Sequence, residues 1–291
     1  MLGEMITTRR VSANGLSFTV DEAGDGDTVA LCLHGFPEAR QAWSEQLPAF
    51  ADLGWRAVAP DLRGYGDSDR PKGRRAYTID TLVADVEALF DALGARRRIL
   101  VGHDWGGIIA WQVAIRRPDL LDGLVILNAP HPAAYRREYD RGLTQKLRSW
   151  YVLFFQLPVL PELGFSANKG RAFERALTAT SPNFPPERLA VYRANACRPG
   201  AATAMVNYYR ANALEFAFGP LPTAKIRTPT LLIWGENDPY LDLALTEGNK
   251  AFVEDFTLRR LPGVSHWVQE DASPEANRLI AEWAGEKGLT R

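Results

Sequence analysis

Short apolar runs and amphipathic stretches alternate along most of the 291-residue chain. Six apolar runs have the length and composition of strands, at residues 29–33, 56–59, 99–101, 124–127, 230–234 and 256–261. Three stretches carry apolar residues at helical spacing, at residues 79–93, 108–115 and 275–283. Such alternation is typical of a parallel sheet with helices on both faces. The pattern therefore predicts an α/β fold with a mostly parallel central sheet.

The middle of the chain breaks this alternation. Residues 131–220 contain no convincing strand-like run and are rich in Arg, Tyr, Phe and Ala. They hold 12 Lys and Arg against 6 Asp and Glu, a net charge of +6, whereas the rest of the chain carries −7. We interpret this positive charge as a solvated helical surface rather than as a partner site. The sequence thus predicts a core in two parts, residues 1–130 and 221–291, with a helical cap at residues 131–220.

Composition and charge argue against several classes of protein. The formal net charge of −1 gives no global field that would draw the chain to nucleic acid or to an anionic membrane. No apolar run approaches the roughly 18–20 residues that cross a bilayer, and no secretory signal is visible, so a cytoplasmic protein is expected. Two cysteines cannot form a disulfide framework, and Cys32, within an apolar run, is interpreted as reduced and buried. The choice between monomer and homodimer stays open.

Asp104 is the central residue of a small–x–nucleophile–x–small pattern that runs from Gly102 to Gly106. The pattern lies between a predicted strand and a predicted helix, which is the setting of a nucleophile elbow. A carboxylate is already ionised at neutral pH and needs no activating base. Its attack on an amide or ester would give an anhydride, so Asp104 indicates displacement at sp³ carbon, as in epoxides or alkyl halides. A helix N-cap is the alternative role for this residue.

An alkyl ester on Asp104 needs a base for its hydrolysis, and His266 is the histidine placed to supply one. It lies in a loop between the last predicted strand and the last predicted helix, as the chain order nucleophile–acid–histidine requires. Asp238 follows the strand-like run 230–234 and is predicted to orient the imidazole. Glu236 is a weaker candidate because it lies closer to the strand, and the preceding strand is followed by Asn128, which is no carboxylate.

Two backbone N–H groups are predicted to form an oxyanion hole. Trp105 follows Asp104 at the start of a helix, and Phe36 lies in a turn that ends an early strand. Both residues are also expected to contact the substrate. A rigid turn here favours a cis peptide bond before Pro37. A Gly-Pro turn without chemistry is the alternative interpretation.

These motifs together resemble those of the α/β-hydrolase fold family and, within it, of the epoxide hydrolases. The matching segments are HGFP (34–37), RGYGDS (63–68), GHDWGG (102–107), GEND (235–238) and GVSHW (263–267). The resemblance implies an α/β-hydrolase fold with a cap inserted after the sixth strand, and it implies no metal and no organic cofactor. The same branch includes haloalkane and haloacid dehalogenases.

The resemblance also implies two cap tyrosines that bind the epoxide oxygen of the substrate. An opening epoxide yields an alkoxide, which leaves poorly without a positioned acid. Tyr151 and Tyr209 look like these two residues. Tyr208 is the alternative to Tyr209. Core packing is the alternative role for these tyrosines. The expected enzyme converts an epoxide and water to a vicinal diol, through an Asp104 ester that a His266-activated water hydrolyses.

Two rival functions remain at this point. A dehalogenase would use Asp104, His266 and Asp238 with halide-binding N–H groups, for which Trp105 would serve and Phe36 would not. A fluoroacetate-type enzyme would be expected to have Arg where Trp105 stands. The second rival is a ligand-binding module on the same fold. The intact nucleophile, acid and base argue against it. The aromatic segment 150–165 indicates an apolar pocket without identifying a substrate.

Overall fold

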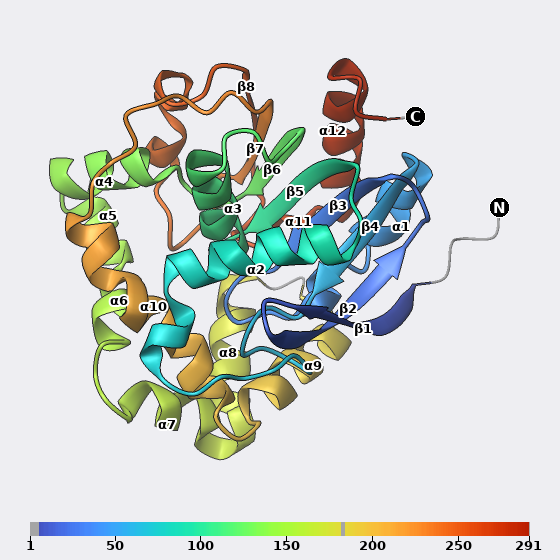
Figure 1. Cartoon of the computed structure of the whole chain (residues 1–291). Coiled ribbons are helices and arrows are strands. Elements are labelled where there is room, and N and C mark those ends of the chain that lie inside the picture. The colour runs from blue at the N-terminus through green and yellow to red at the C-terminus, as the bar shows by residue number, and fades with distance from the viewer. Residues whose placement is uncertain (1–5, 182–183, 291) are drawn as a thin grey trace.

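The computed structural model describes residues 6–181 and 184–290 and has one eight-stranded sheet, in the order β1-β2-β4-β3-β5-β6-β7-β8 (Figure 1). The strands are β1 Thr7–Ala13, β2 Leu16–Ala23, β3 Thr28–Leu33, β4 Trp55–Pro60, β5 Arg97–His103, β6 Gly123–Leu127, β7 Thr230–Gly235 and β8 Phe256–Leu261. Strands β3 to β8 pair in parallel, while β2 pairs antiparallel with both β1 and β4. The prediction of a mostly parallel sheet is confirmed.

The antiparallel hairpin of β1 and β2 is missing from the predicted elements. Asn14 and Gly15 form its two-residue turn with φ angles of 45° and 71°. Two successive positive φ angles are typical of the type I′ turn, for which Asn-Gly is the preferred sequence. The Asn-Gly pair was therefore the signal that could have identified this hairpin.

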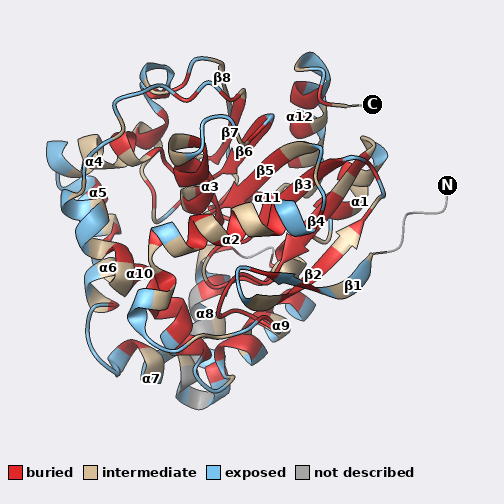
Figure 2. Ribbon diagram, in the orientation of Figure 1, coloured by how far each residue is buried: buried red, intermediate tan, exposed pale blue. Residues whose placement is uncertain are grey.

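Helices cover the sheet on both faces. Helices α2 Ile79–Ala92 and α3 Trp105–Arg116 contribute to one hydrophobic cluster, and α1 Gln46–Asp52 and α12 Ser273–Glu286 contribute to the other. Every residue of β3 is buried, and its side chains alternate between the two clusters (Figure 2). Burial on both faces explains the continuous apolar run of this strand. Cys32 of β3 is fully buried and unpaired, and burial raises the pKa of its thiol.

Between β6 and β7 the described residues form helices and no strand, gathered on one side of the sheet (Figure 1). These helices are α4 Pro132–Arg141, α5 Thr144–Arg148, α6 Trp150–Phe154, α7 Leu160–Ser166, α8 Arg171–Thr180, α9 Pro186–Ala196 and α10 Ala201–Phe218. We keep the name cap for residues 131–220, whose boundaries stay a prediction.

The remaining helices are short. They are α11 Val268–Asp271 and the 3-10 helices η1 Arg40–Trp43, η2 Arg74–Tyr77, η3 Ala167–Gly170, η4 Leu243–Thr246 and η5 Asn249–Ala251. Within residues 6–181 and 184–290, no helix combines the length and apolar character that crossing a membrane requires.

Candidate active site

Asp104 lies in a strained turn between β5 and α3. Its φ of 49° and ψ of −117° are rare for a residue with a side chain, and such outliers concentrate at functional sites. Its carboxylate makes no N-cap hydrogen bond to α3, so the geometry does not support the N-cap interpretation. A Cβ atom on Gly102 would collide with the Gly106 carbonyl oxygen, and one on Gly106 would collide with the Leu33 carbonyl oxygen. Glycine is therefore required where β5, α3 and β3 meet.

The turn that contains Phe36 lies directly against Asp104. The Phe36 backbone N–H donates a hydrogen bond of 2.7 Å to Oδ1 of Asp104, and the Trp105 backbone N–H also stabilises the ionised carboxylate. The peptide bond between Phe36 and Pro37 is cis, as predicted. A Cβ atom on Gly35 would meet the Asp104 side chain, so glycine is needed for this close approach. Two backbone N–H donors thus act on the Asp104 carboxylate, and the Phe36 donor is bound to Oδ1.

His266 connects Asp104 and Asp238. Its Nδ1 lies 2.6 Å from Oδ2 of Asp238, and its Nε2 lies 3.8 Å from Oδ2 of Asp104. The side chains of His266 and Asp238 are 4% and 0% exposed, whereas that of Asp104 is 15% exposed. Of the three groups, the Asp104 carboxylate is therefore the most open to a substrate. Burial raises the pKa of Asp104 more than His266 and the backbone donors lower it.

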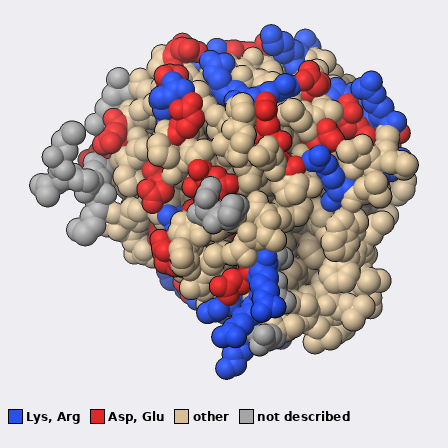
Figure 3. Space-filling model, turned by 180° about the vertical axis from the view of Figure 1, so that it is seen from behind, with Lys and Arg blue, Asp and Glu red and all other residues tan. Residues whose placement is uncertain are grey.

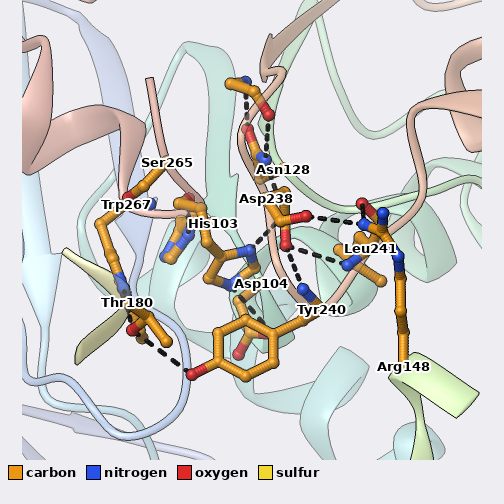
Figure 4. Close-up of polar contacts among 12 residues, drawn as sticks. His103, Asp104, Asn128, Arg148, Thr180, Asp238, Tyr240, Leu241, Ser265 and Trp267 are labelled. Carbon is orange, nitrogen blue, oxygen red and sulfur yellow. Dashed lines mark hydrogen bonds and ion pairs between the residues drawn. The ribbon is translucent and has the colours of Figure 1, made fainter. Parts of the chain in front are cut away.

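Three donors besides His266 hold the Asp238 carboxylate in place (Figure 4). Its carboxylate accepts from Nδ2 of Asn128 at 2.7 Å and from the backbone N–H groups of Tyr240 and Leu241 at 2.7 and 2.9 Å. Burial raises its pKa, but the His266 charge and these donors outweigh burial and lower the pKa overall. Asn128, at the carboxyl end of β6, thus contacts the acid rather than replacing it. Among the carboxylates of segment 235–238, Asp238 and not Glu236 pairs with His266.

The charge state of His266 predicts how stability depends on pH. Burial lowers its pKa, but the carboxylates of Asp238 and Asp104 outweigh burial and raise the pKa to about 9 from the ordinary 6.5. A raised pKa in the folded state stabilises the fold fully below pH 6.5, and this contribution is lost as pH rises through 9. Between these pH values we expect the Tm of the native protein to fall more steeply than that of His266→Gln. Equal slopes in thermal unfolding scans would contradict this ionisation.

The structure brings Tyr151 of α6 and Tyr209 of α10 together. Their ring centroids lie 6.0 Å apart edge to face, and the Tyr209 ring also contacts Trp105 at 5.0 Å and Phe36 at 5.4 Å. Burial and the negative charge of Asp104 raise the pKa of both phenols, which therefore stay protonated donors. The Tyr208 hydroxyl instead donates to the Arg63 carbonyl at 2.8 Å. Of the two neighbouring tyrosines, Tyr209 has the hydroxyl that is not committed to this contact.

Helix α5 of the cap holds the loop that carries Asp238, a contact that sequence reasoning missed. Nη1 of Arg148 donates to the carbonyl oxygens of Asp238 and Leu241 at 2.7 and 3.1 Å (Figure 4). Gln145 donates to the Tyr240 carbonyl at 3.0 Å and accepts from the Asp242 N–H at 2.9 Å. About 90 residues of chain separate these partners, so no local pattern could have indicated them.

A buried polar network behind the site was also missed. Nδ1 of His103 lies 2.8 Å from Oε2 of Glu38, which accepts from the Gly35 N–H, and Nε2 of His103 lies 3.0 Å from the His266 carbonyl. Gln269 donates to the other Glu38 oxygen at 2.6 Å. The network links the loop of His266 to the turn of Phe36. Its sequence signal was the position of Glu38 directly after HGFP and of His103 within GHDWGG.

The groups that converge here are a carboxylate, an imidazole, phenols and backbone N–H donors. In the described part of the chain, no three His, Cys, Asp or Glu side chains lie together as a metal site requires. Phe36 also packs against Phe155 and Phe165 of the cap, with ring centroids 5.4 and 5.6 Å away. The surroundings of Asp104 are therefore largely aromatic, with few polar groups.

Comparison with known proteins agrees with this geometry. The alpha/beta hydrolase fold family matches residues 29–273. Epoxide hydrolase 4 of Mus musculus is 38% identical, over 97% of this chain and 79% of that protein, and epoxide hydrolase 3 of Xenopus tropicalis is 35% identical, over 96% and 78%. The crystal structure of a Bacillus megaterium epoxide hydrolase in complex with an inhibitor is 28% identical, with a TM-score of 0.88 over 95% of this chain and 100% of that one. The chain therefore belongs to the α/β-hydrolase fold family and, within it, to the epoxide hydrolases.

Proposed function

We propose that this protein hydrolyses epoxides to vicinal diols through a covalent ester on Asp104. The observation that carries the proposal is the orientation of this carboxylate. Its Oδ1 is held by the Phe36 N–H at 2.7 Å, and its Oδ2 faces Nε2 of His266 at 3.8 Å. The two relatives and the structural neighbour named above are themselves epoxide hydrolases, which supports the choice of substrate class.

In the first step Oδ2 of Asp104 attacks one ring carbon of the epoxide, and the bond from that carbon to the epoxide oxygen breaks. The electron pair of the broken bond stays on the epoxide oxygen, which the hydroxyls of Tyr151 and Tyr209 stabilise. One phenol transfers its proton to this oxygen, and solvent restores it later. The product is a hydroxyalkyl ester, whose carbonyl oxygen is the Oδ1 atom already bound by the Phe36 N–H.

In the second step His266 takes a proton from water, and the resulting hydroxide attacks Cγ of Asp104. The negative charge that forms on Oδ1 is stabilised by the N–H groups of Phe36 and Trp105. The ester bond then breaks, the diol oxygen takes the proton from His266, and the Asp104 carboxyl releases its own proton to solvent, which balances the proton that restored the phenol. Ester formation removes the Asp104 charge, one of the charges that raise the His266 pKa to about 9. Loss of that charge lowers the pKa of His266 and so favours the neutral imidazole that this step requires.

Replacing Tyr151 or Tyr209 by Phe distinguishes a role of these phenols in ring opening from a role in packing. We expect Tyr151→Phe and Tyr209→Phe each to lower the rate of ester formation by about 10²-fold, because a positioned acid contributes about 10²–10⁴-fold. Tyr208→Phe is the matched control. It should keep the rate and lose about 1 kcal/mol of stability with its bond to the Arg63 carbonyl. Stopped-flow measurement with styrene oxide tests this, and loss of ring opening in Tyr208→Phe but not in Tyr209→Phe would contradict it.

One observation favours dehalogenation as a second candidate function. The indole N–H of Trp105 is buried, and its contact with the Tyr209 hydroxyl acts to lower the pKa of that phenol. Trp105 directly follows Asp104 in the chain, and its indole N–H would be the donor to a departing halide. A panel of haloalkanes decides between the two functions. Halide release, together with full activity when both Tyr151 and Tyr209 are Phe, would favour the dehalogenase.

A further inference from the structure

The exposed apolar side chains of this protein gather on and beside the cap. In the described part of the chain, every large hydrophobic residue that is exposed lies between positions 143 and 221. These residues are Leu143, Leu147, Trp150, Leu153, Leu157, Val159, Leu160, Leu163, Leu214, Phe218 and Leu221. Single exposed apolar side chains are common on protein surfaces, but a large group in one region marks an interaction surface.

Eight of these residues, from Leu143 to Leu163, belong to the segment of α5, α6 and α7, and we call them the cap apolar face. Figure 3 shows a broad region without charged side chains over this part of the cap. Trp150 and Leu153 of α6 are 64% and 70% exposed, whereas Tyr151 of the same helix packs against Tyr209. Helix α6 thus directs apolar side chains toward solvent and carries a proposed catalytic phenol on its inner side.

Most of the charges on and beside the cap apolar face are basic, with Asp140 of α4 as an exposed acid close by. Lys146, Lys169, Arg171 and Arg175 are exposed, and no described carboxylate forms an ion pair with any of them. The two carboxylates within residues 143–180 are already paired, Glu162 with Arg210 and Glu174 with Arg193. Helix α8, which carries two of the four cations, packs against α7. The apolar side chains and the free cations therefore belong to adjoining helices.

We propose that the cap apolar face docks this protein on an anionic phospholipid surface. Leucines and a tryptophan that enter the boundary between headgroups and acyl chains, with cations beside them, are the features of an interfacial binding segment. A second copy docked face to face would bring the same uncompensated cations together, so lipid matches the charge better than a symmetric dimer does. The net charge of −1 conceals this property, because the cap and the rest of the chain carry +6 and −7.

The proposal goes beyond the proposed reaction and does not depend on it, since binding is measured without substrate. The full chain is sedimented with vesicles of phosphatidylcholine alone and of phosphatidylcholine with phosphatidylglycerol. We expect binding to the anionic vesicles that weakens as salt is raised. Leu153→Glu should weaken this binding at least about tenfold, and the double variant Arg171→Glu with Arg175→Glu should do the same. Absence of binding, or equal binding by these variants, would overturn the proposal.

Two controls keep the test decisive. The double variant Arg96→Glu with Arg227→Glu changes the net charge equally, at exposed positions before β5 and β7, and should bind within about twofold of the native protein. Turnover of a water-soluble epoxide by Leu153→Glu shows that the variant is folded. If light scattering finds a native dimer that Leu153→Glu converts to a monomer, and neither binds vesicles, the face is an interface between copies and the proposal fails.

Discussion

His266→Gln is expected to stop the reaction after its first step and to leave the substrate attached to Asp104. Attack by the carboxylate needs no base, whereas hydrolysis of the ester needs the proton transfer that His266 performs. The rate of ester hydrolysis should fall by about 10²–10⁴-fold. Mass spectrometry should then find one equivalent of adduct on the peptide that contains Asp104.

His131→Gln is the matched control for this variant. His131 is also buried, but it accepts a hydrogen bond from the Ala133 N–H and stacks on Phe252 rather than pairing with Asp104. This variant should form diol at close to the native rate and accumulate no adduct. Continued diol formation by His266→Gln without any adduct would contradict the assignment of the base.

Asp104→Gly is expected to abolish turnover without unfolding the protein. Loss of the nucleophile should lower kcat at least about 10⁴-fold, as removal of a covalent nucleophile does elsewhere. The φ of 49° at this position strains any residue with a side chain, and the carboxylate is desolvated, so glycine should keep or raise the Tm. Activity assays and thermal unfolding on the same sample measure both effects.

Activity and Tm of Asp104→Gly, measured together, distinguish a catalytic role of Asp104 from a structural one. A positioning or purely structural Asp104 would lose stability together with activity. A variant that is inactive but at least as stable as the native protein indicates that the residue serves the reaction at a cost to the fold. An active Asp104→Gly would exclude the covalent route.

Strong periodic signals explain what could be predicted from the sequence. The buried strands and α2 have continuous or helical apolar patterns, and the residues expected near the nucleophile follow the carboxyl ends of parallel strands, which meet at one edge of a sheet. Asp104, His266 and Asp238 lie together for that reason. The cis bond before Pro37 followed from the rigidity of its turn.

Contacts between distant segments explain what was missed. Arg148 and Gln145 reach the Asp238 loop across the interface of cap and core, and neither residue type at its position indicates a partner. The choice between Tyr208 and Tyr209 depends on which hydroxyl donates a hydrogen bond to the Arg63 carbonyl. No sequence pattern indicates that contact. The positive charge of the cap was interpreted as solvated because its exposed apolar neighbours became visible only in three dimensions. A cytoplasmic location stays a prediction, and the choice between monomer and homodimer stays open.

A single turnover in ¹⁸O-labelled water tests the Asp104 ester most directly. With protein in excess over epoxide, the oxygen added to the substrate comes from the carboxylate, and the water oxygen enters Asp104 when the ester is hydrolysed. The account predicts an unlabelled diol and ¹⁸O in the Asp104 peptide. Label in the diol of the first turnover, with an unlabelled Asp104, would contradict it.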